Sequence, residues 1–172
     1  MIEKLKICMV GATGVGKTSL VGRFVSSIFH EQYKTTIGVN IQTRTVSRGD
    51  RELKLVLWDL SGEDEFQSVQ PEYVRGAAGY FIVIDGTRPE TLDTGISLQE
   101  RIRASLGDVP FVVVLNKIDL VASWELDARW LQALAQRGWQ IARTSAKTGE
   151  GVEDAFNLLA DRILERWAKP WS

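Results

Sequence analysis

Three glycines within six residues, Gly11, Gly14 and Gly16, separate an apolar strand-like run over 5–10 from a helical pattern over 17–26. Glycine adopts backbone conformations that other residues resist, so these glycines predict a tight loop between a strand and a helix. The whole run 11–18, Gly-Ala-Thr-Gly-Val-Gly-Lys-Thr, fits a loop whose backbone N–H groups hold phosphate oxygens at a helix N-terminus. The alternative is a plain glycine-rich turn.

Segments with strand and helix patterns alternate along the rest of the 172-residue chain, with no repeat or low-complexity tract between them. This alternation predicts an α/β fold, one domain over 1–172 in which helices flank a mostly parallel sheet. Gly49, between two alternating runs, predicts an antiparallel hairpin. The other expected strands are 39–46, 53–58, 80–84, 111–115 and 140–143, and the later helices are 65–75, 90–106, 124–137 and 152–169.

Two of these helices carry further detail in the sequence. Ser123 and Gly138 have the residue types of an N-cap and of the glycine that follows a helix, so they bracket the helix over 124–137. The last helix places a stripe of apolar side chains on one face, which we expect to face the core: Val152, Phe156, Leu159, Ile163 and Trp167.

Charge and cysteine content exclude several classes of protein. A formal net charge of −1 gives no basic footprint for nonspecific nucleic-acid binding. The single cysteine, Cys8, cannot form a disulfide within the chain, and no apolar run approaches the length of a membrane span. Residue 2 is Ile and the last four residues contain no cysteine, so we expect no direct lipid anchor and a cytoplasmic location.

Lys17, Thr18 and Asp59 supply the charge and the oxygens that a bound polyphosphate needs. Lys17 adds a positive charge for the β- and γ-phosphates, and the Thr18 hydroxyl is an oxygen donor of the kind that Mg²⁺ prefers. Asp59 follows the strand over 53–58, so it emerges where ligands bind in open α/β sheets and is placed to hold Mg²⁺ through water. Gly62 offers a backbone N–H nearby. Taken alone, Asp59 is more typical of a solvated strand end.

Two polar motifs at the same end of the sheet favour guanine as the bound base. Asn116-Lys117-Ile118-Asp119 follows the strand over 111–115, and Ser145-Ala146-Lys147 follows the strand over 140–143. A carboxylate at Asp119 accepts two hydrogen bonds, from guanine N1–H and from the 2-amino group that adenine lacks. Each motif alone is more often a polar loop, but their occurrence together and in this order indicates a guanine site.

With these motifs the chain resembles the Ras superfamily of small GTP-binding proteins, and within it the Rab branch, over nearly its whole length. The resemblance also rests on the segments 33–39, 58–63 and 73–77. It implies a P-loop NTPase G domain, whose six-stranded, mostly parallel sheet has one antiparallel strand and is flanked by five helices. It further implies a switch that binds GTP or GDP with Mg²⁺, hydrolyses GTP slowly and meets effector, exchange-factor and activating proteins through its switch regions.

The resemblance also implies roles for single residues. Thr36 would close on Mg²⁺ and the γ-phosphate, and Phe29 would pack against the guanine. Ala146 would give a backbone N–H to the guanine oxygen, while Lys117 and Lys147 would lie along the base and the ribose.

The residues in the implied site fall into three groups. The metal ligands are Thr18, Thr36 and Asp59, and the catalytic residues are Lys17, Thr36, Gly62 and Glu63. The nucleotide-binding residues are Gly11, Thr13, Gly14, Val15, Gly16, Lys17, Thr18, Ser19, Phe29, Tyr33, Thr36, Gly62, Asn116, Lys117, Asp119, Ser145, Ala146 and Lys147.

Glu63 departs from the family pattern, which has glutamine at this position. Glutamine accepts from the attacking water and donates to the phosphate, whereas an ionised Glu63 only accepts. Glu63 either positions the water as a stronger base or is repelled by the γ-phosphate, since two unit charges about 4 Å apart repel by about 1 kcal/mol in water. We expect hydrolysis to survive and to depend on pH; the alternative is an exposed carboxylate with no part in the chemistry.

Other functions and origins stay open on the sequence alone. Tyr33 stands where the α subunits of heterotrimeric G proteins carry a built-in arginine, so intrinsic turnover should be slow unless an activating partner supplies one. A GTP-binding scaffold without hydrolysis is an alternative that depends on Glu63, and a phosphate-loop ATPase or kinase is one that Asp119 argues against. The missing prenylation cysteine fits a prokaryotic relative, a soluble regulator or a domain excised from a larger protein.

Overall fold

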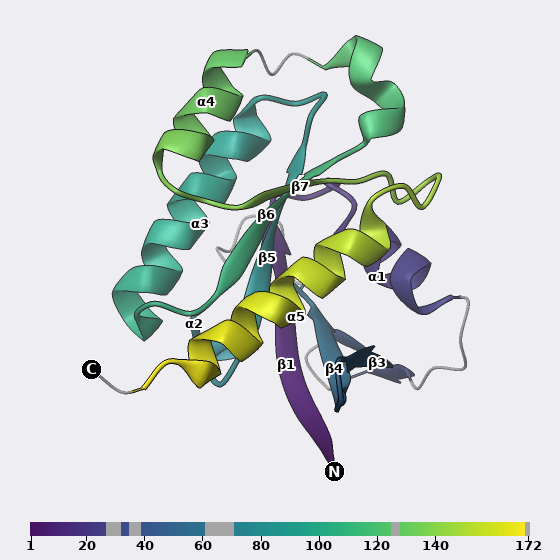
Figure 1. Cartoon of the computed structure of the whole chain (residues 1–172). Helices are drawn as coiled ribbons and strands as arrows, with labels where there is room; N and C mark the ends of the chain where they lie inside the picture. Colours follow the sequence, from purple (N-terminus) through teal and green to yellow (C-terminus); the bar gives the residue numbers. More distant parts are fainter. Residues whose placement is uncertain (27–31, 35–38, 61–70, 125–127, 171–172) are drawn as a thin grey trace.

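The computed structural model describes residues 1–26, 32–34, 39–60, 71–124 and 128–170, and a seven-stranded sheet forms its middle layer (Figure 1). The strands are β1 (Ile2–Gly11), β2 (Gln32–Lys34), β3 (Asn40–Arg48), β4 (Arg51–Asp59), β5 (Gly79–Asp85), β6 (Phe111–Asn116) and β7 (Ile141–Arg143). The helices are α1 (Lys17–Val25), α2 (Pro71–Val74), α3 (Glu90–Leu106), α4 (Ala128–Gln136) and α5 (Val152–Ala168), with a 3₁₀ helix η2 (Ile118–Ser123) before α4.

The strand order β2-β3-β4-β1-β5-β6-β7 confirms the predicted α/β fold. The strands from β4 to β7 in this order pair in parallel, and β3 runs antiparallel to β4 in the hairpin expected around Gly49. All six predicted strands are present. The three-residue β2 adds an antiparallel edge strand, which the polar sequence Gln32-Tyr33-Lys34 does not reveal because it has no apolar alternation.

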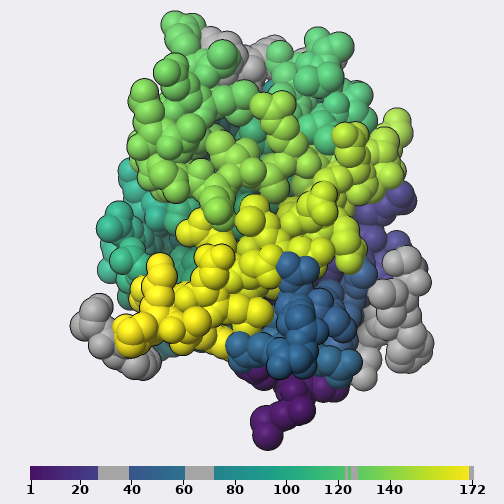
Figure 2. Space-filling model, viewed as in Figure 1, coloured from purple at the N-terminus to yellow at the C-terminus, as the bar shows by residue number. Residues whose placement is uncertain are grey.

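Helices cover both faces of the sheet, and each face has its own apolar core. α1 and α5 lie on one face, and α3 and α4 lie on the other, with α2 beside them (Figure 1). Figure 2 shows α5 lying between the β3–β4 hairpin and the region that contains α4. Central strand β5 is buried at every position, as its continuous apolar run predicts for a strand covered on both faces.

Phe156 is the centre of the core between α1, α5 and the sheet. Its ring stacks on that of Phe24 in α1, with centroids 3.8 Å apart, and meets the edge of Phe81 in β5 at 4.8 Å. The predicted apolar stripe on α5 therefore faces the core from Val152 to Ile163. Trp167 does not, because 49% of it is exposed and its ring lies 5.9 Å from the Arg51 guanidinium at the surface.

The segment before α4 differs from the prediction. Trp124 is extended, with φ −72° and ψ 132°, and Ser123 ends the 3₁₀ helix, so no helix begins at Trp124 and Ser123 is not its N-cap. Gly138 does have the expected positive φ of 74° after α4. Of the helix expected over 65–75, residues 65–70 lie outside the described residues. In the part of the chain that is described, no helix is long and apolar enough to cross a membrane.

Replacing Phe156 with alanine should destabilise the fold far more than the same change at Trp167. Phe156 is 3% exposed and loses two ring contacts, so we expect Phe156→Ala to lower the free energy of unfolding by about 3–5 kcal/mol. Trp167→Ala, on the same helix, should cost less than about 1 kcal/mol because the ring is half exposed. Urea unfolding of both variants checks this, and equal losses would contradict the assignment of Phe156 to the core.

Candidate functional site

The glycine-rich loop joins β1 to α1 as predicted, and its conformation requires glycine. Gly11, Gly14 and Gly16 have φ values of 149°, 74° and 104°. A Cβ atom at Gly16 would also lie 2.2 Å from Asn116 Nδ2, closer than two atoms can approach. The loop and the strand end that carries Asn116 therefore fit together only with glycine at position 16.

Lys17 lies against the loop from which it extends. Its side chain is buried, and its Nζ donates to the carbonyl oxygens of Gly11 at 2.6 Å and Ala12 at 3.0 Å. Burial lowers the pKa of Lys17, and the Asp59 carboxylate opposes that shift. A positive charge is thus held at the loop, where an anion bound by the loop would meet it.

Thr18 and Asp59 place two oxygen atoms that could bind a metal ion next to Lys17. The Thr18 hydroxyl donates to Asp59 Oδ2 at 2.5 Å, and Asp59, at the end of β4, is 2% exposed. A hydroxyl that donates its proton to a carboxylate keeps lone pairs for a cation. Among the described residues no group of three His, Cys, Asp or Glu side chains is placed to hold a metal ion. A metal here would therefore need further ligands besides these two residues.

The buried Asn116 side chain joins the phosphate loop to the loop after β7. Its Nδ2 donates to the Val15 carbonyl at 2.9 Å. Its Oδ1 accepts from Thr144 Oγ1 at 3.0 Å and from the Ala146 N–H at 3.3 Å. Two segments that are far apart in the sequence are therefore held in register by one amide group.

The two polar motifs meet in one pocket beside the phosphate loop. Ser145 Oγ donates to Asp119 Oδ1 at 2.7 Å and accepts from the Thr148 N–H at 3.0 Å, which orients the exposed Asp119 carboxylate. The pocket has a volume of about 370 Å³ and is lined by Gly16, Ser19, Asn116, Lys117, Asp119, Leu120, Ala146 and Lys147. This volume is within the range of small-molecule sites.

A second carboxylate, Asp85 at the end of β5, organises a cluster that the sequence analysis missed. Asp85 is 1% exposed, and it accepts from Lys117 Nζ at 2.7 Å, Arg88 Nε at 3.1 Å and both the N–H and the hydroxyl of Thr87. Burial opposes ionisation, but these hydrogen bonds outweigh it and lower the pKa of Asp85 to about 2. The rule that located Asp59, a carboxylate at the carboxyl end of a strand, applies equally to Asp85.

The two cations that Asp85 holds both bind the phosphate loop. Arg88 donates to the Thr13 carbonyl at 2.5 Å, and Lys117 donates to the Gly14 carbonyl at 3.0 Å. Lys117 adopts a left-handed backbone conformation, with φ 70°, although it is not glycine. Asp85, Arg88 and Lys117 thus form a clamp on the loop. No local pattern in the sequence points to the Arg88 contact, because it joins residues 75 positions apart.

Trp124 supports the base pocket from the outside, which the sequence analysis also did not anticipate. Its indole N–H donates to the Lys117 carbonyl at 2.9 Å. Its ring lies against Gly86, where a Cβ atom would come within 2.2 Å of the indole. The Lys117 backbone is thereby fixed by a side chain from beyond η2.

Several predicted site residues cannot be placed. Phe29, Thr36, Gly62 and Glu63 lie outside the described residues, and of Tyr33 only the backbone in β2 is described. The remaining predicted residues lie around the phosphate loop and the base pocket.

The Ras family model matches the chain over residues 6–165. The chain belongs to the Ras family. It is also similar to Ras-related protein Rab-12 of mouse, rat and human, at 33% identity over 166 residues, which cover 95% of this chain and 68% of each relative. Members of this family are GTP-binding switches that hydrolyse GTP, so the chain is a small GTPase of Rab type, and regulator and effector proteins are its general class of partner.

Removing Arg88 should loosen the phosphate loop of this GTPase without unfolding it. We expect Arg88→Ala to speed GDP release by about two- to tenfold, since it removes a charge-assisted hydrogen bond from a partly exposed arginine. Arg101→Ala changes an exposed arginine in α3, the helix that follows Arg88, and should leave the release rate unchanged. Displacement of a fluorescent GDP analogue measures both rates, and equal rates for the two variants would show that the clamp does not hold the nucleotide.

Proposed function

We propose that this small GTPase is a single G domain over 1–172 that binds GTP and GDP with Mg²⁺, hydrolyses GTP slowly and acts in the cytoplasm. The observation that carries the proposal is the Ser145–Asp119 hydrogen bond in a pocket next to the phosphate loop. The oriented Asp119 carboxylate would bind the guanine base, and Lys17, held in the loop, would bind the phosphates.

Guanine is the base that the pocket fits best. Ser145 occupies one oxygen of the Asp119 carboxylate, which keeps acceptor capacity for the N1–H and 2-amino donors of guanine. The Ala146 N–H donates a long hydrogen bond of 3.3 Å to Asn116 Oδ1. The same N–H would also donate to the guanine oxygen. Lys117 and Lys147, which line the pocket, would lie along the base and the ribose.

The phosphates would lie in the glycine-rich loop, with Lys17 as their cation. Residues Gly11 to Ser19 supply the loop and the first turn of α1, whose N-terminus favours anions. Thr18 and Asp59 fit Mg²⁺ because they offer adjacent hard oxygens and leave the other positions to Thr36, phosphate and water. When bound, the ion would neutralise charge on the β- and γ-phosphates.

Hydrolysis would involve residues of the two switch segments, which are the segments that contain Thr36 and Gly62. We assign Thr36 and the Gly62 N–H to γ-phosphate contact, Glu63 to the attacking water, and Phe29 and Tyr33 to the nucleotide. The loss of the Thr36 and Gly62 contacts after hydrolysis would release these segments, and effector, exchange-factor and activating proteins would distinguish the two states there. We propose no nucleic-acid partner.

Removing the Asp119 carboxylate should abolish the preference for guanine. We expect Asp119→Ala to weaken GDP binding by about 100-fold or more and to leave the weak binding of ADP unchanged, since only guanine uses this acceptor. Asp154→Ala, which removes an exposed carboxylate from the first turn of α5, should change neither affinity. Competition against a fluorescent nucleotide gives both constants. Equal losses for GDP and ADP would contradict the assignment of Asp119 to the base.

The nucleotide carried through purification tests whether Glu63 supports hydrolysis. We expect protein purified without chelator to release GDP on denaturation, which chromatography identifies. We also expect single-turnover hydrolysis by the parent to vary with pH, because the side chain that we assign to the attacking water is an ionisable carboxylate. Hydrolysis by Glu63→Gln should vary less.

Two results would count against this role of Glu63. Parallel pH profiles for the parent and Glu63→Gln would remove the carboxylate from the chemistry. Retained GTP in the purified protein would favour the alternative function, a GTP-binding scaffold that does not hydrolyse its ligand, and Glu63→Gln would then be expected to restore hydrolysis.

A further inference from the structure

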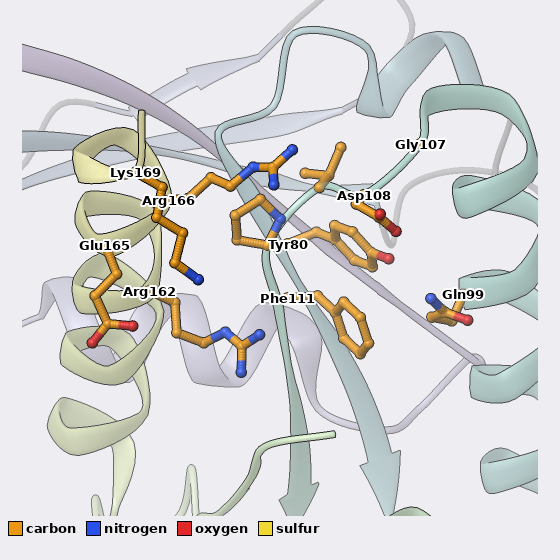
Figure 3. A pocket seen from close by; sticks show the side chains of 11 residues that line it. Tyr80, Gln99, Gly107, Asp108, Phe111, Arg162, Glu165, Arg166 and Lys169 are labelled. Atoms are coloured by element: carbon orange, nitrogen blue, oxygen red, sulfur yellow. The ribbon is translucent and has the colours of Figure 1, made fainter. Parts of the chain in front are cut away.

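A second pocket lies at the opposite end of the sheet from the phosphate loop (Figure 3). It has a volume of about 280 Å³ and is lined by Tyr80 and Phe111 near the amino ends of β5 and β6. The phosphate loop follows the carboxyl end of β1, which runs parallel to β5. The two pockets share no lining residue, so this one is independent of the nucleotide site.

Three basic side chains line this pocket from the C-terminal part of α5. Arg162, Arg166 and Lys169 are spaced by four and three residues, which places them on one side of the helix. Figure 3 shows them along the wall that faces the Tyr80 and Phe111 rings. Within the described residues, none of the three has a hydrogen bond or an ion pair.

Three arginines elsewhere in the chain, by contrast, are paired with carboxylates. Arg44, Arg48 and Arg51 each bind a carboxylate, those of Glu153, Asp161 and Glu3 respectively.

The acidic residues at the pocket do not neutralise its cations. Asp108 pairs with Arg103 at 3.3 Å, outside the basic group. Glu165 also lines the pocket, one helical turn from Arg162 and from Lys169, so the three cations exceed this one carboxylate by two charges. Three like charges on successive helical turns repel one another, and an anion between them would relieve that repulsion.

The floor of the pocket is aromatic and rigid. The rings of Tyr80 and Phe111 stack with centroids 5.3 Å apart, and Phe111 in turn meets the edge of Trp139. A neighbouring pocket of about 600 Å³ shares Arg166 and Lys169 and is lined by apolar residues that include Trp167 and Pro110. The combined site therefore suits an anionic group carried on an aromatic or apolar body.

We propose that this pocket binds a phosphate monoester carried on an aromatic side chain of a partner protein. A phosphate monoester has about two negative charges and three acceptor oxygens, which three cations satisfy, whereas a single carboxylate has one negative charge and two oxygens. The pocket is smaller than most sites for whole small molecules, so it accommodates the phosphate end of a larger partner. The cations line a cavity and do not form a flat basic face, which disfavours a membrane surface.

Phenyl phosphate, titrated into protein saturated with GDP and Mg²⁺, tests the proposal because the nucleotide site is then occupied. We expect saturable shifts of the backbone amide signals of Val109, Phe111 and residues 162–169 in ¹⁵N–¹H spectra, and no such shifts with phenol. The double variant Arg162→Gln/Arg166→Gln should weaken binding by at least about tenfold, the loss expected for one charge-assisted hydrogen bond. Its GDP release rate should equal that of the parent, which shows that it is folded.

The matched control is Lys4→Gln/Arg101→Gln, which removes two exposed positive charges elsewhere and should bind phenyl phosphate as the parent does. Shifts that do not saturate, or equal binding by both double variants, would overturn the proposal in favour of a general charge effect. Vesicles of phosphatidylserine and phosphatidylcholine form the second arm. If they sediment the parent but not Arg162→Gln/Arg166→Gln, and phenyl phosphate does not bind, the pocket serves a lipid surface and the proposal is wrong.

Discussion

The side-chain amide of Asn116 is the contact on which the geometry of the nucleotide site depends. It is 1% exposed and bonds Val15 on one side and Thr144 and Ala146 on the other. A buried amide that loses a hydrogen-bond partner has a polar atom without water or protein contact, which costs free energy. The three hydrogen bonds of Asn116 therefore support one another. The phosphate loop and the base pocket are therefore one structure, built around a residue that need not touch the reacting phosphate.

The clamp on the loop follows the same physical logic with charges in place of an amide. Asp85 is buried, and its pKa is low because the hydrogen bonds from Lys117, Thr87 and Arg88 outweigh the effect of burial. Removal of either cation would leave a buried negative charge with fewer donors, which is more costly than the loss of one exposed ion pair. The loop before α3, which carries Arg88, is in this way connected to the loop that precedes α1.

Much of this architecture could be read from residue patterns. The apolar runs over 80–84 and 111–115 identified central strands, and the polar residues after strands located Asp59, Asn116 and Asp119 at one end of the sheet. What failed depends on contacts between distant segments. β2 exists only as the partner of β3, and the exposure of Trp167 and the inward position of Trp124 depend on neighbours from elsewhere in the chain. Asp85 is different, because it is a carboxylate at the carboxyl end of a strand, as Asp59 is, and its position was therefore predictable from the sequence.

The packing of Trp124 on Gly86 limits how this chain can change over evolutionary time. Any side chain at position 86 would overlap the indole, and a smaller residue at 124 would remove the donor that holds the Lys117 carbonyl. A substitution at either position is thus tolerated only after a compensating one at the other. Positions 86 and 124 are expected to covary among descendants of this sequence, although they lie in different loops and neither lines the nucleotide pocket.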